Sequence, residues 1–511
     1  MNAAAHARKT ATLLRAVAEA AAAAGGAGRV PGAVGRVPAG LIGLAKSTSN
    51  LFRDRPTAHP RIGLQGFDEV IGVDRATGLI DAEGMATYAA LVDAGLGTCG
   101  LAGDPQAGAA GAGDRPPFRP SAQSPFQPVA PQTVPAHGRP EMQPVVPLVV
   151  PQLRTITVGG ALAGVGIEAS AFRHGLVHET VASFDVLTGD GRLLHCTPEG
   201  EHRALFFGFP NSYGTLGYAL RVQVRTQPAR AFVALEHRRY QSAADCLEAI
   251  ARSCEAPDSD YLDGVAFAPD DLVLTRGHFT DAAPWTSDYG GEQVYHRSLR
   301  ERERDFLTTH DYLWRWDTDW FWCSRHFGAQ HPLVRRLLGR ERLNSATWQR
   351  WMRWNSRWGL TRAWQRLWGR HPESVIQDVD IPLPRAAEFL DFLKREVGIW
   401  PVWLCPIRAA PATPRWTLYA LQPGVPHLNF GFWDVILDRQ AQPPGWHNRR
   451  IEAEVTRLGG RKSLYSECWY SEDEFWALHD RPAYLALKAA YDPGSALGDL
   501  HAKCTARGGR G

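Results

Sequence analysis

A glycine-rich segment, TVGGALAGVGIEA from Thr157 to Ala169, has a composition that lets the backbone approach an anionic ligand closely. Its glycines carry no Cβ, so neighbouring backbone amides can reach a pyrophosphate without steric conflict. An upstream segment, KSTSN from Lys46 to Asn50, has small hydroxyl and amide side chains that can donate to phosphate oxygens. Either segment alone could serve only a turn, but the two together favour a pyrophosphate-binding site.

The same segment also contains the dinucleotide fingerprint G-x-G-x-x-A, from Gly164 to Ala169, and Asp185 stands about where an acidic ribose partner would fall. That fingerprint requires a helix to begin inside it, with its N-terminus facing the pyrophosphate. The residues that follow, SAFRHGLVHET, include Gly175 and show no amphipathic period. We therefore expect glycine-rich loops rather than a Rossmann fold.

Candidates for proton transfer lie in the aromatic stretch LYSECWYS, which contains Tyr465, Glu467 and Cys468. A carboxyl desolvated by Trp469 and Tyr470 would have a raised pKa and could hold a proton near neutrality. Glu467 and Tyr465 are therefore the predicted catalytic residues. A salt-bridged or exposed Glu467 remains the alternative.

The bulk composition excludes several classes of function. The chain has 511 residues, enough for two or three domains, and its formal net charge of +3 gives no reason to expect nucleic acid as a partner. The 8 cysteines are scattered without a CxxC pair, which fits a reducing compartment and argues against a zinc site or a disulfide framework. No run is apolar enough to predict a membrane span or a secretory signal, so we expect a cytoplasmic protein.

The order of predicted elements indicates an α+β fold without regular βαβ repeats. We expect a helix over 11–24, two strands around a turn at 76–78, a helix over 85–97, and strand, turn, strand, helix and strand over 181–226. A change of style near Pro228 predicts a domain boundary there. Further strands are expected over 261–267, 272–279, 375–381, 416–421 and 427–433, and helices over 243–253, 385–397, 472–479 and 483–491.

Two segments differ from the rest of the chain. Residues 98–143 are rich in Gly, Ala, Pro and Gln and cannot bury enough apolar surface to offset their ordering entropy, so a disordered insertion is expected, with a functional lid as the alternative. Residues 348–370 predict an amphipathic helix that has Trp351, Trp354 and Trp358 on one face and arginines on another. Such a helix can lie in a membrane interface, and the alternative is a cap packed on the second domain.

The motifs LAKSTSNLFR, VPQLRTITVGGALAGVGIEASAFRHGLVHE, DVLTGDGRLLHCTPEGE and FPNSYGTLGYAL resemble the FAD-binding PCMH-type domain of the vanillyl-alcohol-oxidase superfamily. Further along, ESVIQDVDIPL, VGIWPVWLCPIR, LYSECWYSEDEFW and YLALKAAYDP resemble segments of the delta(24)-sterol reductase (Diminuto/seladin) family, in the same order. The resemblance extends over most of residues 41–504. It implies an N-terminal Ala/Gly-rich segment (1–40), an FAD-binding domain (41–228) and a substrate domain (229–504).

The resemblance also implies which residues contact FAD. These are Thr48, Ser49 and Asn50 in the first loop; Thr157, Val158, Gly159, Gly160, Ala161, Leu162, Ala163, Gly164, Val165, Gly166, Ile167, Glu168 and Ala169 in the second; and Gly214, Thr215 and Gly217 of the GTLG turn. Asn429 and Lys488 are weaker candidates for flavin contact. The first loop has no histidine or cysteine at the tethering place, so FAD is expected to be non-covalent. The insertion at 98–143 and the absence of the membrane-spanning N-terminus of the animal sterol reductases are departures from the family.

The implied activity is the reduction of a C=C bond in a hydrophobic, sterol- or isoprenoid-like substrate, with NADPH as the expected electron donor. Hydride transfer to an isolated alkene needs a general acid that protonates the other carbon. Trp400, Trp403 and Trp433 could wall the substrate cavity or could simply be core residues. Two alternatives remain: an alcohol or aldonolactone oxidase or dehydrogenase on the same scaffold, and a degenerate flavoprotein fold that acts as a binding protein.

Overall fold

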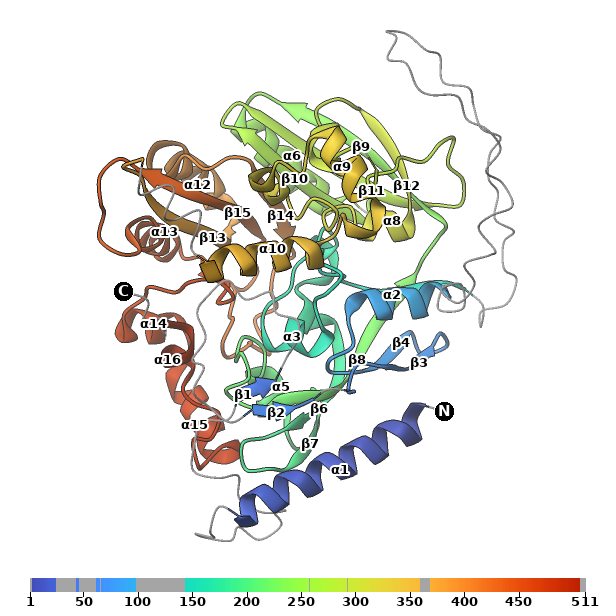
Figure 1. The fold of residues 1–511 in the computed structure, drawn as a ribbon, viewed down its shortest axis with the longest axis vertical. Coiled ribbons are helices and arrows are strands. Elements are labelled where there is room, and N and C mark those ends of the chain that lie inside the picture. The colour runs from blue at the N-terminus through green and yellow to red at the C-terminus, as the bar shows by residue number, and fades with distance from the viewer. Residues whose placement is uncertain are drawn as a thin grey trace.

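The computed structural model describes residues 2–23, 43–45, 61–64, 66–97, 143–256, 258–291, 293–358 and 368–505. Two regions singled out from the sequence lie outside these residues: the predicted first flavin loop with Thr48, Ser49 and Asn50, and nearly all of the predicted insertion at 98–143. Two large antiparallel sheets organise the rest, one in each half of the chain (Figure 1). The predicted α+β class is therefore confirmed.

The first sheet has six strands, in the order β3-β4-β8-β6-β7, with β5 paired to β8. Its strands are β3 (Val70–Asp74), β4 (Leu79–Glu83), β5 (Val145–Pro147), β6 (Val181–Leu187), β7 (Leu193–Cys196) and β8 (Tyr218–Pro228). The expected hairpin around residues 76–78 joins β3 to β4. The helices of this half are α2 (Tyr88–Leu96), α3 (Val158–Ala163), α4 (Ala171–His174) and α5 (Arg203–Gly208), with a 3-10 turn, η3 (Val177–Thr180).

The second sheet has eight strands, in the order β12-β9-β11-β10-β14-β15-β13-β16, and neighbouring strands in it are antiparallel. Its strands are β9 (Phe232–Tyr240), β10 (Tyr261–Ala268), β11 (Asp271–Thr280), β12 (Arg304–Thr308), β13 (His371–Pro382), β14 (Val402–Ile407), β15 (His427–Asp438) and β16 (Arg461–Lys462). Thus β8 ends the first sheet at Pro228, and β9 begins the second at Phe232. A short parallel pair, β1 (Gly43–Ala45) with β2 (Arg61–Gly63), stands apart from both sheets.

The two faces of the second sheet bury different side chains. On β14, Val402 and Leu404 join one core cluster, whereas Trp403 and Cys405 join another, as alternation along a strand requires. Helices cover the first face: α6 (Ala243–Glu255), α12 (Ala386–Phe392) with its extension η7 (Leu393–Val397), and α13 (Trp446–Arg457). Against the other face lie aromatic side chains from the segment 309–327, which contains α8 (Thr309–Leu313) and η4 (Cys323–Phe327).

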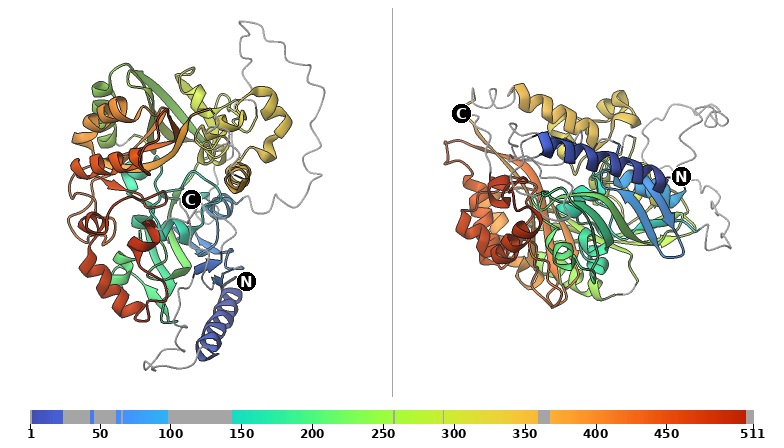
Figure 2. Two further views of the ribbon diagram at one scale, coloured as in Figure 1. Left: turned by 60° about the vertical axis from the view of Figure 1, so that its left-hand side comes forward. Right: turned by 90° about the horizontal axis from the view of Figure 1, so that it is seen from below.

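The two ends of the chain both return to the first sheet (Figures 1 and 2). Helix α1 (Asn2–Ala23) starts well before the predicted residue 11, because the alanine-rich residues ahead have the same helix propensity. Its His6 and Lys9 hydrogen-bond to the buried carboxylate of Glu83, at 2.9 and 3.0 Å. The last helices are α14 (Glu472–Leu478), α15 (Arg481–Tyr491) and α16 (Leu500–Thr505), and α15 packs on α5.

Most predicted elements are confirmed, but the strand expected over 416–421 is wrong. Leu418, Tyr419 and Leu421 are buried there, as the apolar pattern indicates, yet the segment is irregular. Its backbone groups bond to other elements instead of to a neighbouring strand: the amide of Thr417 donates to the carbonyl of Phe207 at 3.1 Å. Between residues 330 and 358, the chain forms α9 (Pro332–Leu338) and α10 (Ser345–Trp358), and α7 (Tyr295–Ser298) lies before them in sequence.

Candidate functional site

The predicted flavin segment begins as a short helix. Thr157 caps α3, since its Oγ1 accepts a hydrogen bond from the amide of Gly160 at 3.3 Å. The amide of Gly159 donates to the carbonyl of Gly84 at 2.8 Å, and a Cβ at Gly159 would lie 2.7 Å from that oxygen. Contrary to expectation, the Gly159 amide is therefore not open to an anion, because a close backbone contact uses it. Gly160, its neighbour, is exposed.

The rejection of a Rossmann fold is confirmed. The helix that follows the G-x-G-x-x-A match, α4, has only four residues and begins beyond the match at Ala171. The adjoining sheet is antiparallel, so no parallel βαβ unit surrounds the segment.

The glycine-rich segment and the GTLG turn lie side by side. The amide of Tyr213 donates to the carbonyl of Ala163 at 2.8 Å, and that of Asn211 donates to the carbonyl of Gly164 at 3.2 Å. The turn contains unusual positive φ angles, 64° at Asn211, 49° at Tyr213 and 80° at Gly214. The glycine-rich segment and the turn, which are far apart in sequence, thus form one continuous surface, the glycine-rich wall.

Several residues predicted to bind FAD contribute side chains to the core instead. Val158, Ala161 and Leu162 form the buried side of α3, and Val165 and Ile167 pack against a second cluster. These side chains are buried because the helical segment covers the sheet below it.

Contacts within the protein hold the C-terminal end of the GTLG turn in place. Thr215 is buried, and its carbonyl accepts a hydrogen bond from Nζ of Lys488 at 3.0 Å. A Cβ at Gly217 would lie 2.7 Å from the carbonyl oxygen of Leu187, which explains the glycine there. Lys488, a weaker candidate for flavin contact, therefore fastens the turn.

The carboxylate of Glu168 forms a buried ion pair. Its Oε1 accepts from Nη2 of Arg315 at 2.6 Å, and the same nitrogen lies 3.0 Å from Oδ2 of Asp263. Nε1 of Trp403 also donates to that oxygen of Asp263, at 3.1 Å. Burial raises the pKa of Glu168 to about 7, against the opposing effect of Arg315. The glycine-rich segment is thus tied to β10 and β14 of the second sheet.

Two carboxylates on β13 form the most distinctive polar group in the second half. Asp378 and Asp380 are two residues apart on a strand and so share a face. Oδ2 of Asp378 accepts from the hydroxyl of Tyr465 at 2.7 Å, and Nε1 of Trp433 donates to that hydroxyl at 2.8 Å. Oδ1 of Asp378 is shielded from solvent and has no hydrogen-bond partner among the described residues. Burial raises the pKa of Asp378 well above its usual range.

Both carboxylate oxygens of Asp380, unlike those of Asp378, have hydrogen-bond partners. Its two oxygens accept hydrogen bonds from Tyr419 and Asn429, both at 2.7 Å. Burial raises its pKa to about 6. Asn429, considered for flavin contact from the sequence, is thus a partner of Asp380.

Tyr213 brings the two halves of the site together. A Cβ on Gly164 would lie 3.5 Å from the Tyr213 hydroxyl, so that hydroxyl borders the glycine-rich wall. Tyr213 also contributes to the raised pKa of Tyr419 and of Tyr465, after the larger effect of burial. The glycine-rich segment and the Asp378–Tyr465 pair are therefore both neighbours of Tyr213.

The two residues predicted to be catalytic, Tyr465 and Glu467, lie in different surroundings. Tyr465 lies within the site just described. Glu467 is half-buried, and its carbonyl accepts a hydrogen bond from Lys462 at 2.5 Å. The carboxylate that this aromatic stretch desolvates is Glu452, which accepts from the amide of Trp469 at 2.9 Å and whose pKa burial raises. The catalytic role of Glu467 stays a prediction.

Asp378 and Asp380 were missed as candidates from the sequence. The available signal was DVD at 378–380, two carboxylates at strand spacing inside the otherwise apolar run that enters the core. The tryptophans considered as cavity walls divide: Trp403 is fully buried, whereas Trp433 is partly buried and touches Tyr465.

Comparison with known proteins shows similarity to sterol reductases. The chain is 25% identical to the delta(24)-sterol reductases of Mus musculus and Homo sapiens over 369 residues, covering 66% of this chain and 66% of each relative. It is 23% identical over 400 residues to the delta(24)-sterol reductase homolog dhcr-24 of Caenorhabditis elegans, covering 71% of each chain. The match thus spans just under two thirds of the length of the mammalian relatives. No family model matches the chain.

A shorter similarity points to a second kind of oxidoreductase. Over 74 residues, 14% of this chain, the sequence is 43% identical to cytokinin dehydrogenase 10 of Oryza sativa subsp. japonica. Both kinds of relative support the predicted enzyme class, an oxidoreductase.

Proposed function

We propose that the protein is an FAD-dependent oxidoreductase that reduces a C=C bond of a hydrophobic, sterol- or isoprenoid-like substrate, with NADPH as electron donor. The similarity to delta(24)-sterol reductases supports the reaction type. The observation that carries the proposal is the position of Tyr213, which joins the glycine-rich wall to a buried, protonatable carboxyl. A reduction of an alkene needs both, a hydride source and an acid.

The residues of the first half fit a flavin on two observations. Gly160 is exposed at the start of the glycine-rich segment, and the strained turn at 211–217 is hydrogen-bonded to the carbonyls of Ala163 and Gly164. In the proposal, Gly160, Gly164 and Gly214 hold the cofactor, together with Thr48, Ser49 and Asn50. When bound, FAD supplies the hydride.

Asp378 supplies the proton in this proposal, and Tyr465 positions it. Burial raises the pKa of Asp378 well above its usual range, which favours the protonated acid, and Oδ1 is the oxygen with no hydrogen-bond partner among the described residues. Tyr465 orients the carboxyl through Oδ2, and Trp433 in turn holds the Tyr465 hydroxyl. Asp378 gives its proton to one alkene carbon while a hydride reaches the other, so the C=C bond becomes CH–CH and Asp378 becomes a carboxylate that water must reprotonate.

One observation favours oxidation as a second candidate, the local similarity to cytokinin dehydrogenase 10. The two candidates share the flavin and differ in the direction of electron flow. An oxidase on the same scaffold would use Asp378 in its ionised form, as a base.

The spectrum of the purified protein tests the proposal. We expect a flavin spectrum, release of all yellow colour into the supernatant on acid precipitation, and anaerobic bleaching by NADPH that a sterol with a side-chain double bond reverses. Bleaching by an alcohol, followed by rapid recovery in air, would support the oxidase instead. A colourless protein that does not take up added FAD would contradict both and favour a binding protein.

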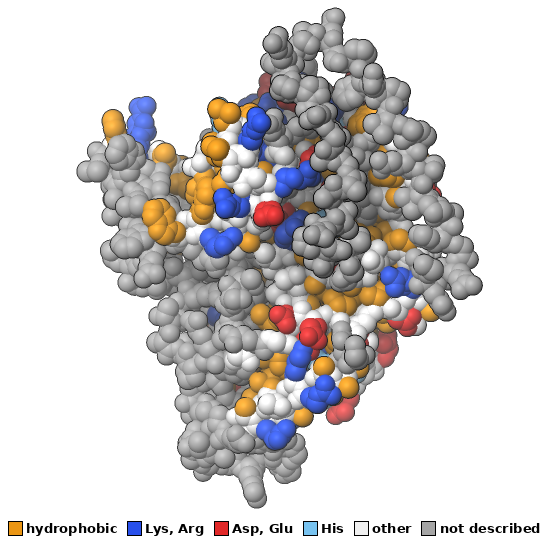
Figure 3. Space-filling view, turned by 45° about the vertical axis from the view of Figure 1, so that its right-hand side comes forward, with side chains coloured by type: hydrophobic (Ala, Val, Ile, Leu, Met, Phe, Trp, Pro, Cys, Tyr) orange, Lys and Arg blue, Asp and Glu red, His pale blue; other side chains and the backbone are white. Residues whose placement is uncertain are grey.

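We also propose that α9 and α10 place the protein on an anionic membrane surface. Among the described residues, no helix is both long and apolar enough to cross a membrane. However, Leu333, Leu337 and Trp354 are 64%, 83% and 60% exposed. Exposed arginines, among them Arg336 and Arg350, lie on the same helices, and Figure 3 shows hydrophobic and basic side chains side by side on the upper left of the visible face. This combination fits the interface of an anionic bilayer.

The expected packing of the tryptophan stripe on the second domain holds for only part of α10. Trp348 is buried and donates from Nε1 to the carbonyl of Thr318 at 3.1 Å. Trp351 and Trp354, one and nearly two turns further on, remain exposed. The helix is thus anchored at its start and presents its later tryptophans outward.

A further inference from the structure

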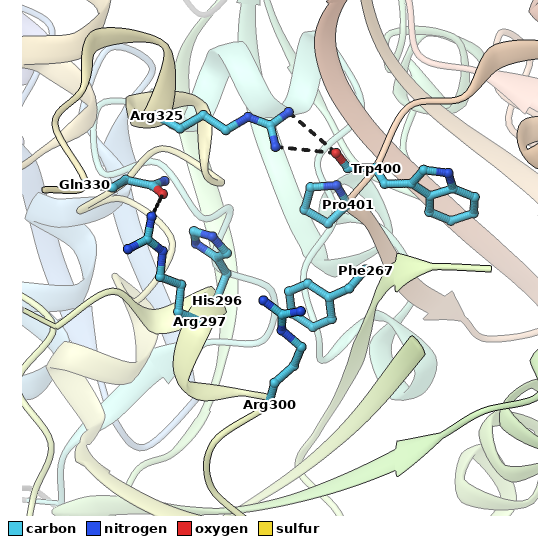
Figure 4. Close-up of a pocket in the computed structure, with 8 residues that line it drawn as sticks. All are labelled: Phe267, His296, Arg297, Arg300, Arg325, Gln330, Trp400 and Pro401. Atoms are coloured by element: carbon cyan, nitrogen blue, oxygen red, sulfur yellow. Dashed lines mark hydrogen bonds between the residues drawn. The ribbon is translucent and has the colours of Figure 1, made fainter. Parts of the chain in front are cut away.

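A strongly basic pocket lies beside the second sheet, separated from the candidate active site by aromatic side chains. It has a volume of about 320 Å³ (Figure 4). Its polar lining comes from α7, η4 and the residues that follow each of them: His296, Arg297, Arg300, Arg325 and Gln330. In Figure 4 these side chains surround an open centre.

The positive charge of this pocket is only partly neutralised. Arg297 donates to the neutral amide oxygen of Gln330 at 2.9 Å. Arg300 lies 3.5 Å from Asp271, but that carboxylate already accepts a shorter bond, 2.7 Å, from Arg239. The pocket therefore retains a net positive charge, which favours an anionic ligand.

The other two basic groups are held in place by carboxylates outside the lining. Arg325 pairs with Asp434 and also donates to the carbonyl of Trp400 at 3.4 Å. Nδ1 of His296 lies 2.7 Å from Oδ2 of Asp319, which is fully buried. These contacts fix the direction of both side chains, so the site is organised before a ligand arrives.

The remaining lining is apolar and flat. Phe267, Trp400 and Pro401 form it, and the guanidinium of Arg300 stacks over the ring of Phe267 with Cζ 4.6 Å from the ring centroid. A guanidinium stacked by its face keeps its N–H groups in the plane, where they can meet an anion two at a time. The pocket thus combines an anion-binding side with an apolar side.

We propose that this pocket binds a phosphate ester, with the phosphate among Arg297, Arg300 and Arg325 and the organic part against Phe267 and Trp400. The pocket is distinct from the candidate active site, because the ring of Trp322 lies between them. The centroid of that ring is 6.0 Å from the ring centroid of His296 on one side and 5.6 Å from that of Trp433 on the other. The proposal therefore does not depend on the proposed oxidoreductase activity.

Two sources share this chemistry, a soluble phosphate ester and the headgroup of an anionic lipid. Titration calorimetry on the protein as purified tests the first, with adenosine 2′,5′-bisphosphate and inorganic pyrophosphate as probes and adenosine as the uncharged control. Co-sedimentation tests the second, with phosphatidylcholine vesicles that contain or lack phosphatidic acid.

The decisive variant is the double substitution Arg297→Ala and Arg300→Ala, which changes two exposed side chains and should leave the fold intact. Its matched control is Arg252→Ala with Arg395→Ala, two exposed arginines outside the pocket. We expect about a tenfold or larger loss of affinity in the pocket variant, since charge-assisted hydrogen bonds are lost, and no change in the control.

Each outcome decides the proposal. Binding of a soluble probe, or of vesicles that contain phosphatidic acid, supports it when the pocket variant weakens that binding and the control variant does not. The source is then the probe that bound. Absence of binding to every probe overturns the proposal, as does equal binding by the pocket variant, which would assign vesicle binding to α9 and α10.

Discussion

Arg315 and Glu168 form an ion pair in which both side chains are at most 1% exposed, with Nη2 2.6 Å from Oε1. The pair joins the glycine-rich segment of the first half to the aromatic core beneath the second sheet. An ion pair of this kind is costly to break from one side, because the remaining charge stays buried without a partner.

We therefore expect Arg315→Met to lower the free energy of unfolding by about 3–5 kcal/mol. Urea unfolding followed by circular dichroism measures the change. The matched control is Arg252→Ala, where an exposed i,i+4 pair with Glu248 is lost, and a change within about 0.5 kcal/mol is expected there. Equal stabilities of Arg315→Met and the parent would show that the pair contributes nothing to joining the halves.

Substitution of the proposed acid should separate chemistry from flavin binding. Asp378→Asn keeps the shape of the side chain but removes its proton, so the turnover number should fall by about one hundred- to ten-thousand-fold. Flavin content should stay at the parent value. Asp391→Asn, on the exposed side of α12, is the control and should retain full activity. An active Asp378→Asn enzyme would contradict this role for Asp378 and favour Glu467 as the acid.

The pH profile gives an independent readout of the same pair. An acid works only while protonated, so activity should fall as pH rises through the raised pKa of Asp378. The hydroxyl of Tyr465 stabilises the carboxylate and holds that pKa down, so Tyr465→Phe should move the alkaline limb to higher pH. A limb that does not move would place the titrating group elsewhere.

Gly160→Val should abolish flavin binding while the protein stays folded. A branched side chain at this exposed position would occupy space that the pyrophosphate needs. Absorbance of the purified variant measures flavin, and circular dichroism measures folding. Gly72→Val is matched to it, because Gly72 is also exposed and a Cβ there meets nothing within 4 Å. Full FAD occupancy in Gly160→Val would refute the proposed site.

The segment 98–143 should be dispensable. The described residues on its two sides already meet: a Cβ on Gly95 would lie 2.3 Å from the carbonyl oxygen of Val145, and Arg75 donates to the carbonyls of both Gly95 and Gln143. A deletion that joins Gly97 to Pro144 should therefore keep flavin content and melting temperature near the parent values. Loss of flavin on deletion would identify the segment as a working lid.

Removal of the exposed tryptophans should weaken membrane binding. Trp351→Ala with Trp354→Ala should reduce co-sedimentation with vesicles that contain phosphatidylserine, because interfacial tryptophans bury apolar area in the bilayer. Trp446→Ala removes a tryptophan of similar exposure, 39%, from α13 and should have no effect. Should the parent protein not bind such vesicles at all, the membrane proposal fails.

The sequence was informative where one local rule decided the outcome. Alternation and turn residues located β3, β4, β10, β11 and β15, and the lack of an amphipathic period after Gly166 argued against a Rossmann unit. The prediction of a strand over 416–421 was wrong because buried apolar side chains do not require a paired strand when the backbone groups find hydrogen-bond partners elsewhere.

The candidate site could be predicted only in part, since it depends on contacts between distant segments. Tyr465 was identified from its aromatic surroundings, but its partner Asp378 comes from β13, and Tyr213 comes from the first half. Glu168 and Gly159 were assigned to the cofactor because they lie in the right motif. Their contacts with Arg315 and Gly84, which only the folded chain reveals, use the carboxylate and the amide in other ways.

The return of the C-terminal helices to the first half constrains the timing of biosynthesis. The amide of Gly189 donates to the carbonyl of Tyr491 at 3.0 Å, and Lys488 holds the turn at Thr215. A nascent chain that has been translated only as far as β16 lacks these contacts. The first half is therefore completed only after α15 has been translated, and binding of FAD at the proposed site is expected to follow the synthesis of α15 rather than accompany that of the first half.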